Sequence, residues 1–171
     1  MIAHTSRLRL ETLSEAHASA MFPVLSDERL YAYIPDVRYV SVEALQERYR
    51  RLERGSLSPE ELWWNFIVFR HDLPTPIGYV QATLMPSLRL AEVAYVLSPL
   101  HWGRGYATEA LSWLISEIGR RGDIDRAQAQ IDQRNFASIA VVRRLGFMFS
   151  RTMVEETSID TLFERGLNLP A

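Results

Sequence analysis

Two glycines separated by one residue, Gly103 and Gly105, lie in the part of the chain whose residue types best suit binding chemistry. They follow an apolar run and precede the most regular helical pattern in the sequence. Small residues let backbone N–H groups approach a ligand closely, and the free N–H groups and dipole at a helix start favour an anion. We therefore predict a main-chain phosphate cradle over Trp102, Gly103, Arg104, Gly105, Tyr106, Ala107 and Thr108, in which Arg104 adds positive charge.

Two well-known phosphate-binding patterns fit this turn poorly. The Walker A pattern requires a lysine, and all 19 basic residues of the chain are arginines. The dinucleotide fingerprint requires a third glycine where this chain has Thr108. From the two glycines alone, an ordinary strand-to-helix turn explains the segment as well as a phosphate site does.

The elements around this turn mix strand and helix patterns. Alternating or continuous apolar runs predict strands over 7–11, 63–69, 77–85, 90–97, 127–131, 147–149 and 153–163. Helical spacing predicts helices from Ser14, from Ser41 to Gly55, over 106–118, and from an N-cap at Asn135 to Arg144. This order predicts an α/β layered domain with a mixed central sheet of about seven strands and about four helices. We expect residues 1–171 to form a single domain.

Composition narrows the function further. The formal net charge of −2 gives no sign of a surface for nucleic acid or membrane, so we expect neither partner. The absence of cysteine excludes a thiolate nucleophile and cysteine-ligated metals, and the absence of lysine excludes a Schiff base. We expect no metal site. No apolar segment follows a basic start at the N-terminus, so the expected location is the cytoplasm.

The turn and two other segments together resemble one protein family. The turn resembles motif A of the GNAT acyltransferase superfamily, Gln/Arg-x-x-Gly-x-Gly/Ala, which is matched at Gly105 and Ala107 but has Trp102 in place of Gln or Arg. The segment Asn135–Phe147 is similar to the family pattern Asn-x-x-Ser-x-x-Val-x-x-Lys/Arg-Leu-Gly-Phe. The opening Thr5-Ser-Arg-Leu-Arg-Leu resembles the branch that contains the ribosomal-protein N-terminal acetyltransferases.

The resemblance implies an acetyl-CoA-dependent N-acetyltransferase whose central sheet is splayed open between two parallel strands, here 90–97 and 127–131. Motif A would hold the pyrophosphate of CoA. The pantetheine arm would pair with the strand that carries Tyr95, Val96 and Leu97, and a backbone N–H near Tyr95 or Val96 would stabilise the oxyanion. Asn135 would hold the pantetheine arm, although an N-cap role alone also explains it.

By the same resemblance, the acetyl group passes directly from the thioester to a primary amine. Ser138 would donate a hydrogen bond to the leaving sulfur, because the tyrosine that many GNAT enzymes use is replaced by Val142. A hydroxyl bonded to its own helix is the alternative for Ser138. Glu92 would act as the base, with Glu155, Glu156 or water alone as alternatives.

The resemblance defines the acceptor side less closely. Tyr33 and Trp64 are candidate substrate contacts, with a place in the aromatic core as the alternative for each. The acceptor is either a protein N-terminal α-amine or a small-molecule amine, and homodimers are frequent in the family. An inactive acyl-CoA-binding regulatory domain of the same fold is the alternative function, because Trp102 and Val142 depart from the family pattern. An unrelated nucleotide-binding α/β domain is a third hypothesis.

Overall fold

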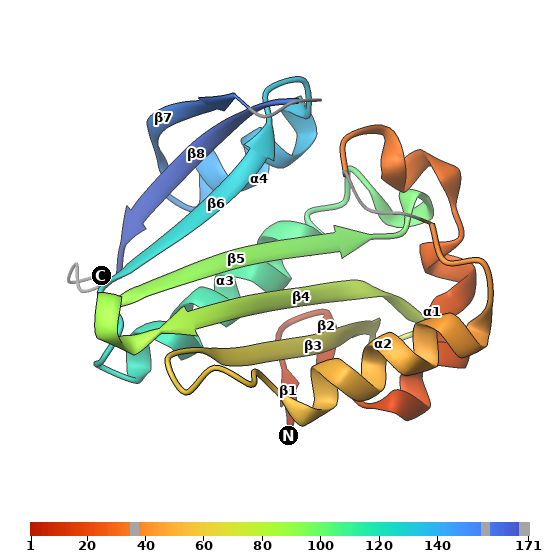
Figure 1. Ribbon diagram of the computed structural model, residues 1–171. Coiled ribbons are helices and arrows are strands. Elements are labelled where there is room, and N and C mark those ends of the chain that lie inside the picture. The colour runs from red at the N-terminus through yellow and green to blue at the C-terminus, as the bar shows by residue number, and fades with distance from the viewer. Residues whose placement is uncertain (35–37, 155–157, 168–171) are drawn as a thin grey trace.

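A computed structural model describes residues 1–34, 38–154 and 158–167 and shows one mixed sheet with helices on both faces (Figure 1). The four α-helices are α1 (Ala18–Leu25), α2 (Val42–Arg54), α3 (Tyr106–Arg120) and α4 (Phe136–Arg144). The strands are β1 (Ile2–His4), β2 (Leu8–Thr12), β3 (Leu62–Arg70), β4 (Pro76–Met85), β5 (Leu90–Leu97), β6 (Arg126–Asp132), β7 (Met148–Val154) and β8 (Ile159–Gly166). Short 3-10 turns cover Glu15–His17, Glu28–Ala32, Pro86–Leu88 and Pro99–His101.

The sheet is split between its two parallel strands. Its order is β1-β2-β3-β4-β5-β6-β8-β7, and among these neighbours β5 and β6 are the parallel pair. Their pairing runs from Leu90 with Arg126 to Glu92 with Gln128 and stops there, and the two strands then diverge (Figure 1). The predicted splay between 90–97 and 127–131 is therefore confirmed. We call the opening beyond Glu92 and Gln128 the split.

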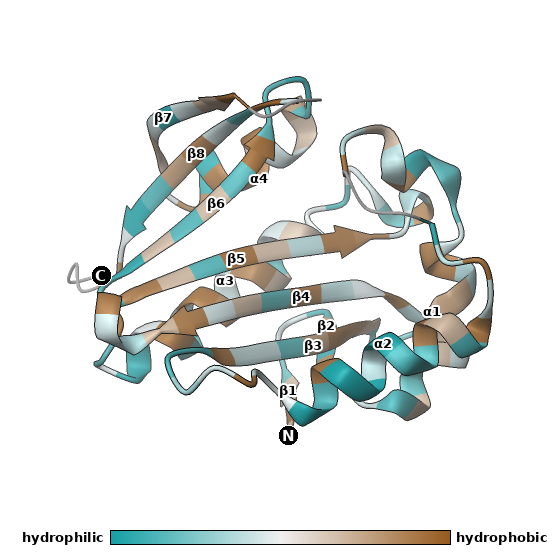
Figure 2. Ribbon diagram, viewed as in Figure 1, coloured by the Kyte–Doolittle hydropathy of each residue, from teal (hydrophilic) through white to brown (hydrophobic). Residues whose placement is uncertain are grey.

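The two faces of the sheet carry different layers. Val80, Ala82 and Leu84 of β4 are buried in a core that includes residues of α3 and α4. Tyr79 points to the other face, where it packs with a second cluster built from α1, α2 and Val96 of β5. Figure 2 shows the corresponding alternation of hydrophobic and hydrophilic residues along the strands. Each strand of this region thus offers alternate side chains to the α1–α2 face and to the α3–α4 face.

The predicted order of elements is confirmed, but the strand predicted over 153–163 is wrong in its bounds: Val154 ends β7, and β8 covers Ile159–Gly166. No glycine or proline in 153–163 marked the break between the two strands. Two further differences lie at the N-terminal end. The sheet has eight strands, because the short edge strand β1 pairs with β2, and no apolar pattern in residues 2–4 indicated it. The first α-helix begins at Ala18, since Ser14 precedes a 3-10 turn, and it ends two residues after Pro23. In the described ranges, no helix is both long and apolar enough to cross a membrane.

Candidate functional site

The predicted phosphate cradle lies between the end of β5 and the start of α3. Gly105 is the N-cap of α3, with φ of +79°, and Gly103 has φ of +72°. Other residues adopt this left-handed conformation with difficulty, so both positions require glycine. A Cβ atom added at Gly103 would meet open space, which shows that the turn faces outward and not into the core.

The backbone N–H groups of the cradle are free. Among the described residues, no acceptor receives a hydrogen bond from the N–H groups of residues 103–108, and no side chain caps α3. The buried Thr108 Oγ1 atom is also without a partner in the described part of the chain. A run of unpaired donors at a helix start suits an anion with several oxygens, such as a pyrophosphate.

Trp102 occupies the place where the motif has Gln or Arg, and it has a different task. Its indole Nε1 donates a hydrogen bond of 2.7 Å to the backbone carbonyl of Leu97, the last residue of β5. This hydrogen bond therefore connects the cradle to the C-terminal end of β5. This contact gives a structural reason for the departure from the family pattern.

Ser138 and Asn135 lie at the start of α4, across the split from β5. Asn135 Oδ1 accepts a hydrogen bond of 3.1 Å from Ser138 N, so Asn135 is the N-cap of α4. Within the described residues, no hydrogen-bond partner engages Ser138 Oγ, and the alternative of a hydroxyl bonded to its own helix is not observed. The hydroxyl is half-buried and available to a ligand. Val142 is fully buried in the α3–α4 core.

The Tyr95 side chain spans the split. Its hydroxyl donates a hydrogen bond of 3.0 Å to the backbone carbonyl of Ser138. Burial raises the pKa of Tyr95 to about 12, an effect that the hydrogen bond to Ser138 partly offsets. The phenol is therefore protonated at neutral pH. The family resemblance implied only a backbone role for Tyr95, and the structure shows this further contact of its side chain.

Glu92 lies at the closed end of the split. Its Oε1 atom accepts a hydrogen bond of 2.5 Å from Gln128 Nε2, across the last pair of parallel residues. Both side chains line a cavity of about 180 Å³, which we call the carboxamide cavity; its other lining residues are Gln81, Thr83, Val93, Ala94, Gln130 and Leu162. The strand alternation around the apolar Ala127, Ala129 and Ile131 was the signal in the sequence that places Gln128 and Gln130 together.

A second cavity adjoins the first on the α1–α2 face. This tyrosine pocket has a volume of about 30 Å³ and is lined by Leu13, Leu25, Leu30, Tyr31, Ile34, Tyr39, Arg48, Tyr49, Leu52, Tyr79, Gln81 and Val96. Gln81 lines both cavities, so they lie side by side on β4. Burial raises the pKa of Tyr49, whose hydroxyl has no hydrogen-bond partner among the described residues.

The two predicted substrate contacts lie in different places. Trp64 is on the α3–α4 face, 6.4 Å from Phe66 between ring centroids and beneath the guanidinium of Arg121. Trp64 and Glu92 point to opposite faces of the sheet, because side chains alternate along a strand and it is the adjacent Trp63 that shares the face of Glu92. Trp63 pairs with Thr83, which pairs with Glu92, so Trp63 is the tryptophan on the face of Glu92.

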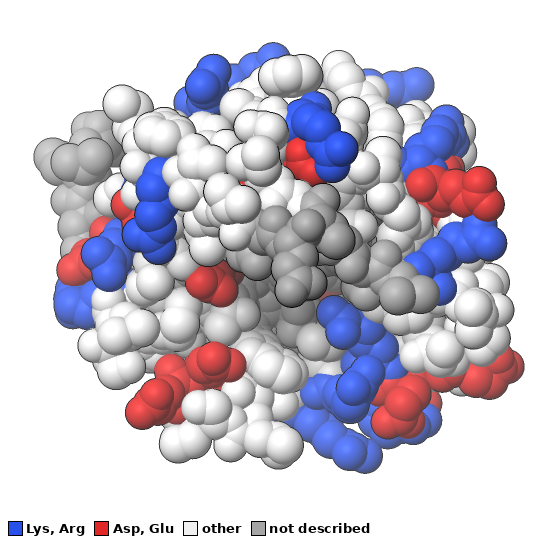
Figure 3. Space-filling model, turned by 45° about the horizontal axis from the view of Figure 1, so that its top comes forward, with Lys and Arg blue, Asp and Glu red and all other residues white. Residues whose placement is uncertain are grey.

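Tyr33 lies near the far side of the split. It is 42% exposed, and the guanidinium of Arg134, in the connection from β6 to α4, lies 5.8 Å from its ring centroid. Arg134 in turn pairs with the buried carboxylate of Asp132, whose pKa is lowered by this hydrogen bond. Figure 3 shows acidic and basic side chains interspersed on this face, without a field of one charge. Glu155 and Glu156, the alternative bases, lie outside the described residues.

Comparison with known families supports the interpretation of this geometry. A model of the acetyltransferase (GNAT) domain matches residues 7–148. The uncharacterized N-acetyltransferase p20 of Bacillus licheniformis is 25% identical over 145 residues, which are 84% of this chain and 80% of that protein. YkkB, an uncharacterized protein of Bacillus subtilis, is 24% identical over 166 residues, which are 94% of this chain and 93% of that protein.

Solved structures share the fold over nearly the whole chain. RimL, a ribosomal-protein α-N-acetyltransferase solved with coenzyme A, superimposes on this chain with a TM-score of 0.85 at 23% identity. The alignment covers 97% of this chain and 98% of RimL. Spermidine N-acetyltransferase of Vibrio cholerae, solved with CoA and spermine, has a TM-score of 0.81 at 17% identity, with 95% of this chain and 97% of that chain aligned. These likenesses show a common architecture.

Proposed function

The chain belongs to the GNAT acetyltransferase family, an acyltransferase family that uses acetyl-CoA, and we propose that it acetylates a primary amine by direct transfer. The observation that carries the proposal is the run of free N–H groups over residues 103–108, placed directly beside the split between β5 and β6. The first feature suits the pyrophosphate of CoA. The second leaves the β6-facing edge of β5 without a strand partner beyond Glu92, while β4 pairs with the other edge. In our proposal the extended pantetheine arm pairs with this open edge.

The absence of cysteine excludes a covalent thioester intermediate on the enzyme. In our proposal the amine attacks the thioester of acetyl-CoA itself. In our proposal a backbone N–H near Tyr95 or Val96 stabilises the developing oxyanion. Ser138 Oγ donates a hydrogen bond to the leaving sulfur, and Asn135 supports the pantetheine arm while it caps α4.

The attacking amine must lose a proton. In our proposal Glu92 accepts that proton, directly or through a water molecule held by the amide side chains of the carboxamide cavity. An α-amine has a pKa of about 8 and a lysine-type amine about 10.4, so roughly a tenth of the first is neutral at pH 7 and far less of the second. The demand on the base is therefore smaller for an N-terminal acceptor.

The lining of the two cavities favours an acceptor with one amine over a polyamine. Among their described lining residues, Glu92 is the carboxylate and Arg48 the cation, and the rest are neutral. A chain of several ammonium groups would find one counter-charge there. We therefore propose the α-amine of a peptide or of a small amino-acid-like molecule as the acceptor, with a neutral side chain directed to the tyrosine pocket.

A thiol-release assay tests the proposal. The purified protein is incubated with acetyl-CoA and a panel of acceptors: peptides with different N-terminal residues, amino-acid amides and spermidine. We expect turnover with α-amines and little with spermidine. Tight acetyl-CoA binding by calorimetry without turnover on any acceptor would instead support the inactive regulatory domain, and the absence of CoA binding would overturn the proposed function.

A further inference from the structure

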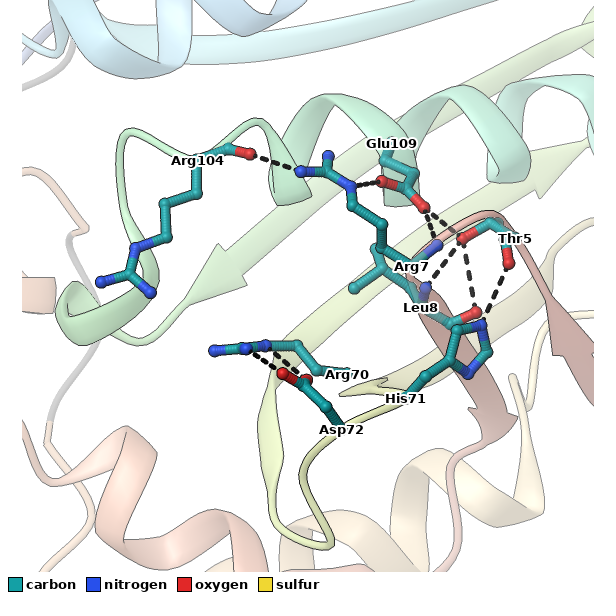
Figure 4. A network of polar contacts seen from close by, with 8 residues as sticks. All are labelled: Thr5, Arg7, Leu8, Arg70, His71, Asp72, Arg104 and Glu109. Carbon is teal, nitrogen blue, oxygen red and sulfur yellow. Dashed lines mark hydrogen bonds and ion pairs between the residues drawn. The ribbon is translucent and has the colours of Figure 1, made fainter.

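Arg7, at the start of the chain, reaches the phosphate cradle from outside it. Its Nη1 atom donates a hydrogen bond of 2.9 Å to the backbone carbonyl of Arg104, and its Nε atom contacts Glu109 Oε2 at 2.6 Å (Figure 4). One guanidinium therefore connects the glycine turn to the first turn of α3. The arginine and the helix are 102 residues apart in the sequence at this contact.

The guanidinium also lies against Gly105 and Tyr106, two of the four residues between these contacts. It lies 4.7 Å from the ring centroid of Tyr106, and its Nη2 atom would lie 3.4 Å from a Cβ atom placed on Gly105. The peptide bond between Arg104 and Gly105 is trans, so its carbonyl and N–H point in opposite directions. By holding the carbonyl of Arg104, Arg7 turns the N–H of Gly105 away from itself and toward the open side of the cradle.

The negative charge of Glu109 near the cradle calls for a neighbouring cation such as Arg7. Its carboxylate lies in the first turn of α3, close to the N–H groups that would receive a phosphate anion. Burial alone would raise the pKa of Glu109, but hydrogen bonds from Thr5 and Arg7 outweigh that effect and lower it. Thr5 Oγ1 and Arg7 N bind one carboxylate oxygen at 2.6 and 2.8 Å, and Arg7 Nε binds the other. Glu109 thus remains negative, and Arg7 is the cation that compensates it.

We propose that Arg7 is a positioning residue for acetyl-CoA: it holds the glycine turn in its anion-binding conformation and cancels the charge of Glu109 beside the phosphate. This inference rests on the assignment of the cradle to CoA, and it is independent of which amine is the acceptor. It gives a physical reason for an arginine in the segment that precedes β2. Without Arg7, a bound pyrophosphate would face an uncompensated carboxylate within one helical turn.

The test compares two thioesters that differ in the phosphate part. Acetyl-CoA carries the pyrophosphate, and S-acetylpantetheine lacks it. In Arg7→Gln we expect the KM for acetyl-CoA and its dissociation constant to rise roughly 10- to 100-fold. This is the change in affinity that the loss of one or two charge-assisted hydrogen bonds produces. The KM for S-acetylpantetheine and the kcat at saturation should stay within roughly twofold.

Matched variants separate this role from a general structural one. Arg9→Gln removes the same charge from β2, where Arg9 pairs with Glu11 and lies 4.3 Å from the ring centroid of Phe69, and it should leave both thioesters unaffected. The double variant Arg7→Gln/Glu109→Gln should recover part of the lost affinity, because the uncompensated charge is gone. Arg7→Lys keeps the charge and should fall between wild type and Arg7→Gln.

Two results would overturn the inference. Equal losses for acetyl-CoA and S-acetylpantetheine would show that Arg7 supports the fold and not the phosphate, and an unchanged acetyl-CoA affinity in folded Arg7→Gln would show that it does neither. If Arg7→Gln does not fold, Arg7→Lys carries the same comparison, with a smaller expected loss for acetyl-CoA. Failure of the wild type to bind acetyl-CoA would be a failure of the proposed function, which the calorimetric control reports separately.

Discussion

The Tyr95 hydroxyl donates a hydrogen bond of 3.0 Å to the backbone carbonyl of Ser138 and so links β5 to α4 across the split in the sheet. The two strands at the split are paired only up to Glu92 and Gln128, so this bond joins the two halves of the sheet beyond that point. It also fixes the backbone of Ser138, whose hydroxyl we propose as the hydrogen-bond donor to the leaving sulfur. The same phenol therefore contributes to stability and to the position of a proposed catalytic group.

Replacing the Tyr95 hydroxyl should cost stability, whereas replacing that of Tyr49 should not. Tyr95→Phe removes a donor that is used, and we expect the free energy of unfolding to fall by about 1 kcal/mol. Tyr49→Phe removes a buried hydroxyl that has no partner among the described residues, and we expect a change between zero and a gain of about 1 kcal/mol. Urea denaturation of both variants measures the difference. A clear loss in Tyr49→Phe would reveal a buried water in the tyrosine pocket as its partner.

Ser138→Ala should slow the chemical step more than it weakens binding. Without a hydrogen bond to the leaving sulfur, we expect kcat to fall roughly 10- to 100-fold while the KM for acetyl-CoA changes little. Ser116→Ala is the matched control, because Ser116 Oγ donates to the carbonyl of Ser112 on the exposed side of α3. An unchanged kcat in Ser138→Ala would mean that another group stabilises the leaving sulfur, and the neighbouring Tyr95 hydroxyl would be the next group to remove.

Glu92→Gln should reduce the rate in a way that depends on pH. If Glu92 removes the proton from the acceptor, kcat/KM should drop roughly 100-fold near pH 7. The loss should shrink toward about pH 9, where most of an α-amine is already neutral. Glu117→Gln, which changes a partly buried carboxylate paired with Arg120 on α3, away from the split, is the control. A loss that is equal at all pH values would mean that Glu92 binds the acceptor without taking its proton.

The sequence predicted the elements well because each buries one apolar stripe or alternation, and these patterns are local. The helix over 106–118, the strands over 90–97 and 127–131 and the N-cap at Asn135 all depend on residues close to one another in the chain. The splay between the two parallel strands was instead an implication of the family resemblance. The short strand β1 has no such pattern, since it is an edge strand of three residues. It forms because β2 offers it a free edge, which only the folded sheet defines.

The position of the backbone part of the candidate site could be predicted from the sequence. The contacts between side chains from distant segments could not. The glycine turn needs only its own residues, so its position followed from the sequence. The face on which Trp63 or Trp64 lies depends on the register of β3 against β4, which the local pattern of a strand buried on both sides does not fix. The contacts of Arg7 with Glu109 and of Tyr95 with Ser138 join segments whose proximity is a property of the whole fold.

Glu109 should make the stability of the protein depend on pH in a defined direction. Although burial opposes it, hydrogen bonds from Thr5 and Arg7 lower the pKa of the folded carboxyl, so the unfolded chain binds this proton more readily. The contribution of Glu109 is therefore fully present above the unfolded pKa of about 4.3 and is lost as the pH falls through the lower folded-state pKa. In Glu109→Gln we expect a smaller fall in the free energy of unfolding between about pH 5 and pH 3 than in the wild type. Urea denaturation across this range measures it, with Glu28→Gln, a change at an exposed carboxylate, as the control. Parallel curves for Glu109→Gln and the wild type would contradict the prediction, because they would mean that this carboxyl titrates alike in both states.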